Sequence, residues 1–181
     1  MKTMRTVSVV LAVSMLALPA LASEKKTYAG KIAETEMGFT ATIDEYTSDD
    51  DTFVLAEKLL EKGQQGLVDA ISRLKAGRIQ FDEGASYQVN VIRTLQTEQG
   101  LLVAFVTDRP LNSDESRKAG SPGPTLGYLE LLLNDDGTGG GRLIPGAKVV
   151  FNEEGYMEAE STGGQTFALS GVAAQSGVAA Q

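Results

Sequence analysis

Hydrophobic and polar residues alternate along several short stretches of the chain. Phe39, Ala41 and Ile43 are separated by polar residues, a pattern typical of a strand with one buried face. Residues 28–34 are expected to form the hairpin partner of this strand. Further along the chain the pattern predicts strands over residues 78–82, 87–96, 101–107, 126–133, 143–151 and 156–160.

Three polar connections end in glycine, at residues 97–100, 134–137 and 152–155. Glycine adopts the positive φ that a type I turn followed by a bulge requires, so each connection is predicted to close an antiparallel hairpin. Residues 101–106 are apolar at every position, which predicts a strand covered on both faces. The glycine-rich run 137–142 lacks the lysine and the helix of a phosphate loop, so we interpret it as a flexible hairpin tip.

Between residues 48 and 77 the hydrophobic period becomes helical. Ser48 and the three aspartates after it suit a helix N-terminus, because a hydroxyl caps free N–H groups and carboxylates favour the positive end of the helix dipole. Gly63 is predicted to end this helix, and Gly77 to end a second one. The apolar residues at helical spacing are Phe53, Leu55, Leu59 and Leu60, then Leu67, Val68, Ile71 and Leu74. We therefore expect an αα-hairpin with one apolar side.

These elements predict an α+β fold for residues 23–162, which we expect to form a single domain. An antiparallel sheet, either open or curled into a partly closed barrel, would carry the αα-hairpin after its first two strands. The remaining residues, 163–181, are of low complexity. The hexapeptide Ser170–Gln175 is repeated without change at Ser176–Gln181. Such small residues bury little surface, which predicts a disordered tail, with a tether or docking tail as the alternative.

Residues 1–22 have the features of a signal peptide. Lys2 and Arg5 precede a short apolar run, and small residues stand at the positions that a signal peptidase reads, with cleavage expected before Ser23. The apolar run, residues 7–18, is shorter than the roughly 20 residues of a membrane span. We expect export to the periplasm or the medium and no stable membrane insertion after cleavage. A short N-terminal anchor is the alternative.

The composition removes whole classes of chemistry. The chain contains no cysteine, histidine or tryptophan. This excludes Ser-His-Asp and Cys-His nucleophiles, zinc sites built from histidine or cysteine, thiolate iron–sulfur clusters and disulfides. No cofactor is expected. With 24 acidic against 16 basic residues and a net charge of -8, nucleic acid is not an expected partner.

Carboxylates are the main chemistry that remains. A pair of them about 5 to 10 Å apart could serve a glycosidase, but sequence spacing does not show that any two converge, and solvated surface charge is the favoured interpretation. Calcium is a second hypothesis, for the acidic segments 49–51 and 134–137. The second segment does not fit the EF-hand template, and the first is explained by helix capping. No metal site is therefore assigned.

The connection from residue 108 to residue 125 is the longest irregular stretch, and long loops in compact domains often carry function. Its candidate ligand-binding residues are Asp108, Arg109, Arg117 and Lys118. The favoured interpretation of Arg109 is structural, as an ion pair with a neighbouring carboxylate or a cap on carbonyls at the strand end. The alternative is recognition of an anionic group by Arg109 with Arg117 or Lys118.

Several of these motifs, taken in order, resemble a group of small exported bacterial proteins common in Acidobacteria, with no assigned activity. The resemblance covers residues 38–160 and is carried by Tyr46-Thr47-Ser48-Asp49-Asp50, Leu59-Leu60-Glu61-Lys62-Gly63-Gln64, Thr107-Asp108-Arg109-Pro110 and Asp136-Gly137. It implies the fold and export, and it transfers no functional residue to this chain.

Three hypotheses for the function follow. The leading one is an exported, non-catalytic binding or interaction module for a small ligand, a glycan or an envelope protein. The first alternative is a carboxylate-dependent hydrolase acting on envelope or extracellular glycans. The second is a structural or assembly protein that docks through a sheet edge or its C-terminal tail. A concave surface in the structure would favour the first hypothesis.

Overall fold

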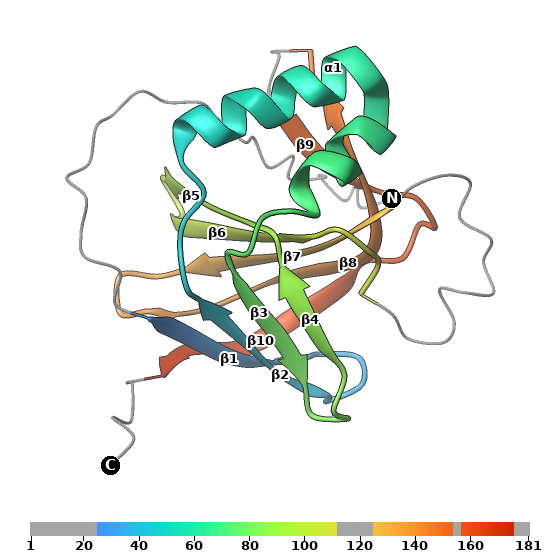
Figure 1. The fold of residues 1–181 in the computed structure, drawn as a ribbon. Helices are drawn as coiled ribbons and strands as arrows, with labels where there is room; N and C mark the ends of the chain where they lie inside the picture. The colour runs from blue at the N-terminus through green and yellow to red at the C-terminus, as the bar shows by residue number, and fades with distance from the viewer. Residues whose placement is uncertain (1–24, 112–124, 154–156, 176–181) are drawn as a thin grey trace, which may run out of the picture.

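The computed structural model describes residues 25–111, 125–153 and 157–175. Ten strands and one helix follow each other along the chain (Figure 1). They are β1 (Lys26–Ile32), β2 (Gly38–Ile43), α1 (Asp49–Ile71), β3 (Gly77–Phe81), β4 (Ser86–Val89), β5 (Val91–Thr97), β6 (Gly100–Thr107), β7 (Leu126–Leu133), β8 (Thr138–Phe151), β9 (Met157–Ser161) and β10 (Phe167–Gln175). The signal peptide predicted for residues 1–22 lies outside the described residues.

The strands form one antiparallel sheet that curls into a nearly closed barrel. Their order is β4-β3-β2-β1-β10-β8-β7-β6-β5, and β9 pairs with β8 alone. The two end strands, β4 and β5, are consecutive in the chain and are separated only by Asn90. The predicted antiparallel sheet is therefore confirmed, in its barrel form.

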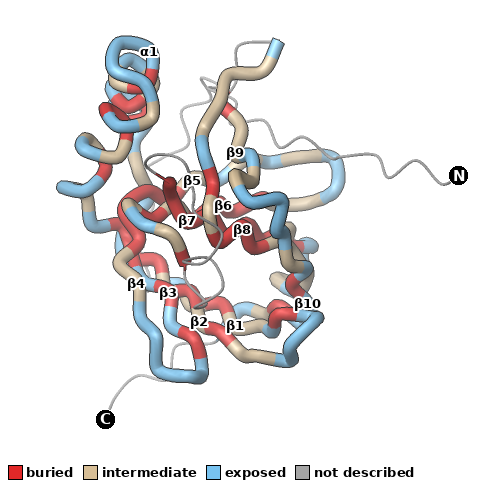
Figure 2. Tube along the Cα trace, turned by 90° about the vertical axis from the view of Figure 1, so that its right-hand side faces the viewer, coloured by how far each residue is buried: buried red, intermediate tan, exposed pale blue. Residues whose placement is uncertain are grey.

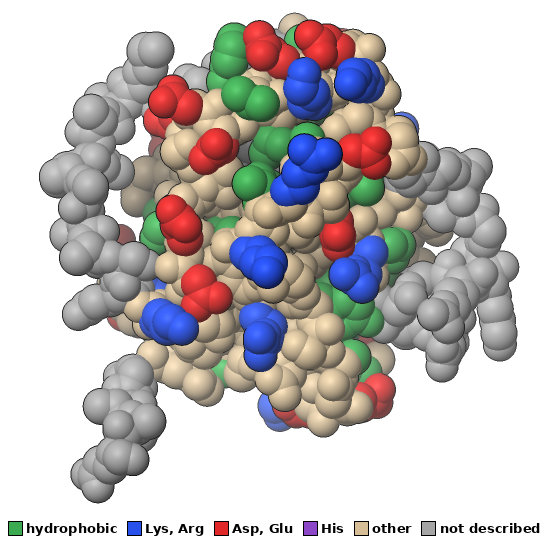
Figure 3. Space-filling view, in the orientation of Figure 1, with side chains coloured by type: hydrophobic (Ala, Val, Ile, Leu, Met, Phe, Trp, Pro, Cys, Tyr) green, Lys and Arg blue, Asp and Glu red, His purple; other side chains and the backbone are tan. Residues whose placement is uncertain are grey.

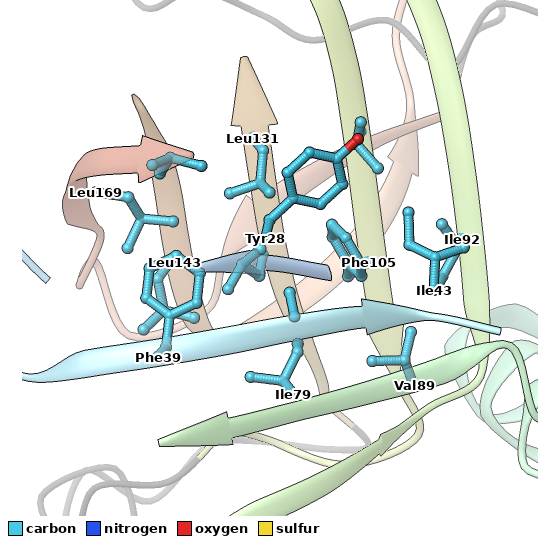
Figure 4. Close-up of a cluster of buried hydrophobic side chains, with 14 of the residues drawn as sticks. Tyr28, Phe39, Ile43, Ile79, Val89, Ile92, Phe105, Leu131, Leu143 and Leu169 are labelled. Atoms are coloured by element: carbon cyan, nitrogen blue, oxygen red, sulfur yellow. The ribbon is translucent and has the colours of Figure 1, made fainter. Parts of the chain in front are cut away.

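The barrel interior is filled by large apolar side chains (Figure 4). Phe39, Ala41 and Ile43 of β2 are all buried, as their alternation with polar residues predicted. Phe105 of β6 and Ile92 of β5 are fully buried opposite them. Each such side chain contributes roughly 1.5–3 kcal/mol by leaving water. A chain without disulfides thus has a core large enough to hold it together.

Helix α1 differs from the prediction, because it is one kinked helix and not an αα-hairpin. Ser48 caps it, and its hydroxyl accepts a hydrogen bond from the backbone N–H of Asp51 at 3.0 Å. Gly63 interrupts the helix with φ 65° and ψ -161°, but helical geometry resumes at once. At this kink the Gln64 side chain accepts a hydrogen bond from the backbone N–H of Val149 at 3.0 Å. The chain bends at Gly63 without an intervening loop, so the two halves form one kinked helix and not a hairpin.

The second predicted helix end was also wrong. The helix ends at Ile71 with Ser72 as its C-cap, and Gly77 is the first residue of β3. A Cβ atom at Gly77 would collide with the carbonyl oxygen of Thr42 on the paired strand. This glycine is therefore explained by the close approach of two strands and not by a helix terminus.

The helix covers the outer face of the sheet. Leu55, Leu67 and Ile71 of α1 pack with Val91 of β5 and Leu126 of β7. Figure 2 shows buried residues concentrated along β6 and β7, while much of α1 is exposed. The prediction that residues 101–106 are covered on both faces is confirmed for its central part, since residues 102–105 are all buried.

The C-terminal prediction was wrong for residues 167–175. They form β10, which lies inside the sheet between β1 and β8. Leu169 and Val172 are buried in the barrel core, and Gly171, at φ 59°, lies where the pairing register shifts. The anchoring residues Phe167 and Leu169 precede the repeat, so the repeat alone did not reveal the strand. The second copy, Ser176–Gln181, lies outside the described residues.

The glycine-rich run also differs from its prediction, because β8 begins at Thr138 and contains most of the run. Cβ atoms at Gly139 and Gly141 would collide with carbonyl oxygens of Leu132 and Glu130 on β7. Only the turn at 134–137 is a hairpin tip, and Gly137 there has φ 77°. All three predicted hairpins are confirmed by the pairing of β5 with β6, β7 with β8, and β8 with β9.

Candidate functional site

An open hollow lies at the end of the barrel where β1, β6 and β8 begin and β5, β7 and β10 end. Its volume is about 490 Å³. We call the apolar lining its floor (Tyr28, Leu101, Leu133) and the polar lining its rim (Lys25, Lys26, Gln96, Asn134, Asp135, Gln175). The other lining residues are Thr27, Gly137 and Ala174.

The floor residues lie on strands in which every second side chain points into the barrel. Tyr28 of β1 and Leu133 of β7 are buried, and Leu101 of β6 is half-buried. Burial raises the pKa of Tyr28, so its hydroxyl remains a neutral hydrogen-bonding group at physiological pH. Tyr46, on the segment that leaves β2, also has a raised pKa, because of burial and then the nearby Tyr28. The floor is thus an apolar surface that carries a phenol.

The rim is polar and of mixed charge. Lys25 forms an ion pair of 3.1 Å with Asp44. Lys26, Gln96 and Asn134 are exposed, and Lys26 has no ion-pair partner in the part of the chain that the structure describes. Over the face shown in Figure 3, acidic and basic side chains are interspersed. An apolar floor below such a rim suits a small amphipathic molecule.

A set of partly or fully buried hydrogen bonds lies around the link between the two end strands, β4 and β5. We call this region the seam (Thr47, Asn90, Ile92, Thr107, Asp108). The Asn90 side chain donates to the carbonyl of Leu74 at 3.0 Å and accepts from the backbone N–H of Asp108 at 2.8 Å. Its own backbone N–H donates to Val106. Asn90 therefore ties three chain segments together, which splits the single strand predicted for residues 87–96 into β4 and β5.

Sequence analysis missed Asn90, although one signal was present. It is the only polar residue in the run from Val89 to Ile92, and a polar residue inside an apolar run needs a partner when it is buried. Thr47 forms the second link of the seam. Its backbone N–H donates to the carbonyl of Ile92 at 2.9 Å, and its hydroxyl accepts from the Ile92 N–H at 3.1 Å.

Two of the four predicted ligand-binding residues can be placed, and neither lines the hollow. Asp108 and Arg109 follow the end of β6, whereas the hollow lies at the start of that strand. Arg109 Nε is 3.1 Å from Asp108 Oδ1, which matches the structural interpretation of Arg109. Arg117 and Lys118 lie outside the described residues, so the recognition of an anion by this loop stays a prediction.

The threonine of the Thr-Asp-Arg-Pro motif has a structural role. Thr107 is fully buried. Its hydroxyl donates to the carbonyl of Arg109 at 2.5 Å and accepts from the backbone N–H of Gly127 at 3.1 Å. These bonds hold the start of the long connection against the start of β7. The motif therefore fixes where the loop leaves the barrel.

A buried ionic cluster on the outer face of β7 and β8 was also missed. Tyr128 donates to Glu130 Oε2 at 2.6 Å, and Arg142 Nε lies 3.2 Å from Glu130 Oε1 without being aligned for a hydrogen bond. The Arg142 guanidinium lies 5.8 Å from the centre of the Tyr128 ring. Burial, and then the Glu130 carboxylate, raise the pKa of Tyr128 well above its ordinary value. The opposite charges neutralise each other, so we assign this cluster to the structure of the sheet.

A second cavity lies between α1 and the outer face of the sheet. Its lining is almost entirely apolar, with Leu55, Ile71, Val106 and Met157 among its residues, and its volume is about 50 Å³. This is far below the several hundred Å³ of a typical ligand site. We therefore treat it as a packing void.

The acidic segments have partners of their own. Asp49 pairs with Arg93, and Asp51 accepts from the Ser48 hydroxyl at 2.7 Å. Hydrogen bonds from the side chain and backbone of Thr138 lower the pKa of Asp136. Within residues 25–111, 125–153 and 157–175, no cluster of three or more acidic side chains could hold a metal ion. Over the same ranges, no helix has the length and hydrophobicity needed to span a membrane.

Comparison of the chain with family models, with curated protein sequences and with solved structures found no match.

Proposed function

We propose that this protein is an exported, non-catalytic module that binds a small amphipathic ligand in the hollow of its barrel. The observation that carries the proposal is the hollow itself. Its volume of about 490 Å³ falls within the roughly 300–1,000 Å³ of small-molecule sites. An apolar group would rest on Tyr28, Leu101 and Leu133, and a polar group would remain at the rim.

Lys26 is the rim residue best suited to hold a charged group. It is exposed at the first position of β1, and Lys25 beside it is already engaged by Asp44. An ammonium ion without a partner attracts a carboxylate, sulfonate or phosphate with little desolvation cost. The ligand class is therefore an apolar body with an acidic group.

The hydrolase alternative has less support in the described residues. It requires two carboxylates that converge in a cleft. Of the described residues that line the hollow, Asp135 is the only carboxylate. Glu158 is the only one that lines the small cavity under α1.

The test uses 1-anilinonaphthalene-8-sulfonate, an apolar body with a sulfonate, in a fluorescence titration. We expect Lys26→Glu to weaken its binding about tenfold, because an attraction becomes a repulsion. Leu101→Gln, which places an amide on the half-buried floor, should weaken binding by a similar factor.

The matched controls lie on α1. Lys62→Glu makes the same charge change on the exposed helix, and Leu60→Gln removes an apolar side chain that is 72% exposed. Neither control should change the affinity. Absence of binding, or equal affinity in the hollow variants and the wild type, would contradict the proposed function.

A further inference from the structure

The floor of the hollow contains a polar group that packing does not explain. Tyr28 is only 4% exposed, yet its hydroxyl has no hydrogen-bond partner among the residues that the structure describes. Tyr128 is equally buried and donates its hydroxyl to Glu130 at 2.6 Å, as buried phenols normally do. Phenylalanine in place of Tyr28 would fill the same space without the cost of desolvating a hydroxyl.

The Tyr28 hydroxyl is not sealed inside the core. Among the described residues, the side-chain atoms that are fully closed off from solvent and have no partner are Gln64 Nε2 and Arg142 Nε. The Tyr28 hydroxyl also has no partner but is not one of these atoms, so it retains contact with open space. Because Tyr28 lines the hollow, this open space is the hollow. Figure 4 shows the hydroxyl pointing away from Phe39 of the packed core.

A second phenol lies close to this one but outside the hollow. The charge of Tyr28 contributes to the raised pKa of Tyr46, but no hydrogen bond joins the two hydroxyls in the described part of the chain. Tyr46 is 40% exposed and is not among the residues that line the hollow. Its hydroxyl therefore meets solvent and not a bound molecule, which makes it a matched comparison for Tyr28.

The position of Tyr28 on β1 relates it to Lys26 of the rim. Residues two positions apart on a strand direct their side chains to the same side, and both residues line the hollow. Lys26 is exposed and Tyr28 is buried, so the first lies at the mouth and the second at the floor. Two residues of a strand span about 7 Å. A molecule with one end at each residue therefore needs a polar group at both ends of its apolar body.

We propose that the Tyr28 hydroxyl determines the specificity of the hollow by forming a hydrogen bond with an uncharged polar group at the buried end of the ligand, an inference that rests on the function proposed above. The ligand class is then an apolar acid with a hydroxyl or carbonyl group at the end opposite its acidic group. A phenol both donates and accepts, so either group can bind it. An apolar acid without this group would displace water from the phenol without replacing its hydrogen bond.

The experiment compares two probes that differ by one hydroxyl, naphthalene-2-sulfonate and 6-hydroxynaphthalene-2-sulfonate. Their affinities for the full chain are measured by isothermal titration calorimetry at pH 7. We expect the hydroxylated probe to bind about fivefold more tightly. Tyr28→Phe should abolish this preference without weakening the binding of the unsubstituted probe. Tyr46→Phe, which removes the phenol outside the hollow, should keep the preference.

The same variant has a readout that does not depend on any probe. Tyr28→Phe should leave the thermal stability at pH 7 unchanged, because no intramolecular hydrogen bond is lost. A clear loss of stability would show that the hydroxyl has a partner within the protein, and it would overturn the inference. A chain that ends at Gln175 keeps all of β10 and should bind both probes as the full chain does. Tighter binding after truncation would show that residues 176–181 occupy the floor, which would also overturn it.

The remaining outcomes separate this inference from the proposed function. Equal affinity of the wild type for the two probes would overturn the role of Tyr28 and leave the hollow as a binding site. A preference that survives Tyr28→Phe, or one that disappears in Tyr46→Phe, would overturn that role as well. Absence of binding by both probes would contradict the proposed function itself, and the inference with it.

Discussion

The hollow and the seam are both places where strand ends and polar groups meet, and they differ in how those groups are used. In the seam the polar groups form hydrogen bonds with one another. Asn90, Thr107 and Thr47 each make at least two hydrogen bonds, and each has at least one partner in a distant segment. In the hollow, exposed polar side chains surround an apolar floor, and Lys26 has no ion-pair partner in the described chain. The first arrangement stabilises the fold, and the second leaves binding capacity available.

The largest expected effect comes from breaking the seam. Asn90→Ala should lower the free energy of unfolding by about 3 kcal/mol, because the N–H of Asp108 and the carbonyl of Leu74 both lose a buried partner. Urea denaturation measures this loss. Gln96→Ala, which truncates an exposed rim amide, should change stability by less than about 0.5 kcal/mol. Equal losses in the two variants would remove the distinction between the regions.

An intermediate effect is expected from the buried phenol of the floor. Because burial raises the pKa of Tyr28 above the ordinary value of 10.0, the folded protein retains this proton to higher pH than the unfolded chain. The resulting stabilisation is complete below the ordinary value and is lost as the pH rises through the raised one. The free energy of unfolding should therefore fall more steeply above about pH 10 in the wild type than in Tyr28→Phe. Parallel profiles would show that Tyr28 ionises freely in the folded protein.

The smallest expected effect is at Arg109. Its side chain is 66% exposed and pairs with Asp108 at the surface, and exposed pairs contribute less than about 1 kcal/mol. Arg109→Ala should therefore leave both thermal stability and dye affinity nearly unchanged. A large loss of dye affinity with stability intact would favour anion recognition by the loop and would move the binding site away from the hollow.

Much of the barrel could be predicted because it depends on local patterns. The alternation of apolar and polar residues predicted the strand that contains Phe39 and Ile43. The glycines at positions 100 and 137 predicted hairpins that the structure contains. The errors arose where tertiary contacts override local signals. Gly77 and Gly139 are required by neighbouring strands and not by turns, and the small residues of β10 are held by pairing with β1 and β8.

The candidate site could not be predicted from local sequence patterns. Lys26, Gln96 and Leu133 belong to three strands that only barrel closure brings together, and nothing in their own sequence neighbourhoods marks them. Asp108 and Arg109 were predicted to bind a ligand because they begin a long connection. In the structure they pair with each other, and Asp108 is part of the seam. The described start of this conspicuous loop thus does not line the hollow.

The most direct test of the hollow as the binding site is to map the dye contacts by amide chemical-shift changes on addition of 1-anilinonaphthalene-8-sulfonate. The account predicts that the largest changes cluster at Thr27, Gln96, Leu101 and Asn134. Changes centred on Asp108 and Arg109, or on the exposed apolar residues Phe53 and Leu60 of α1, would contradict it.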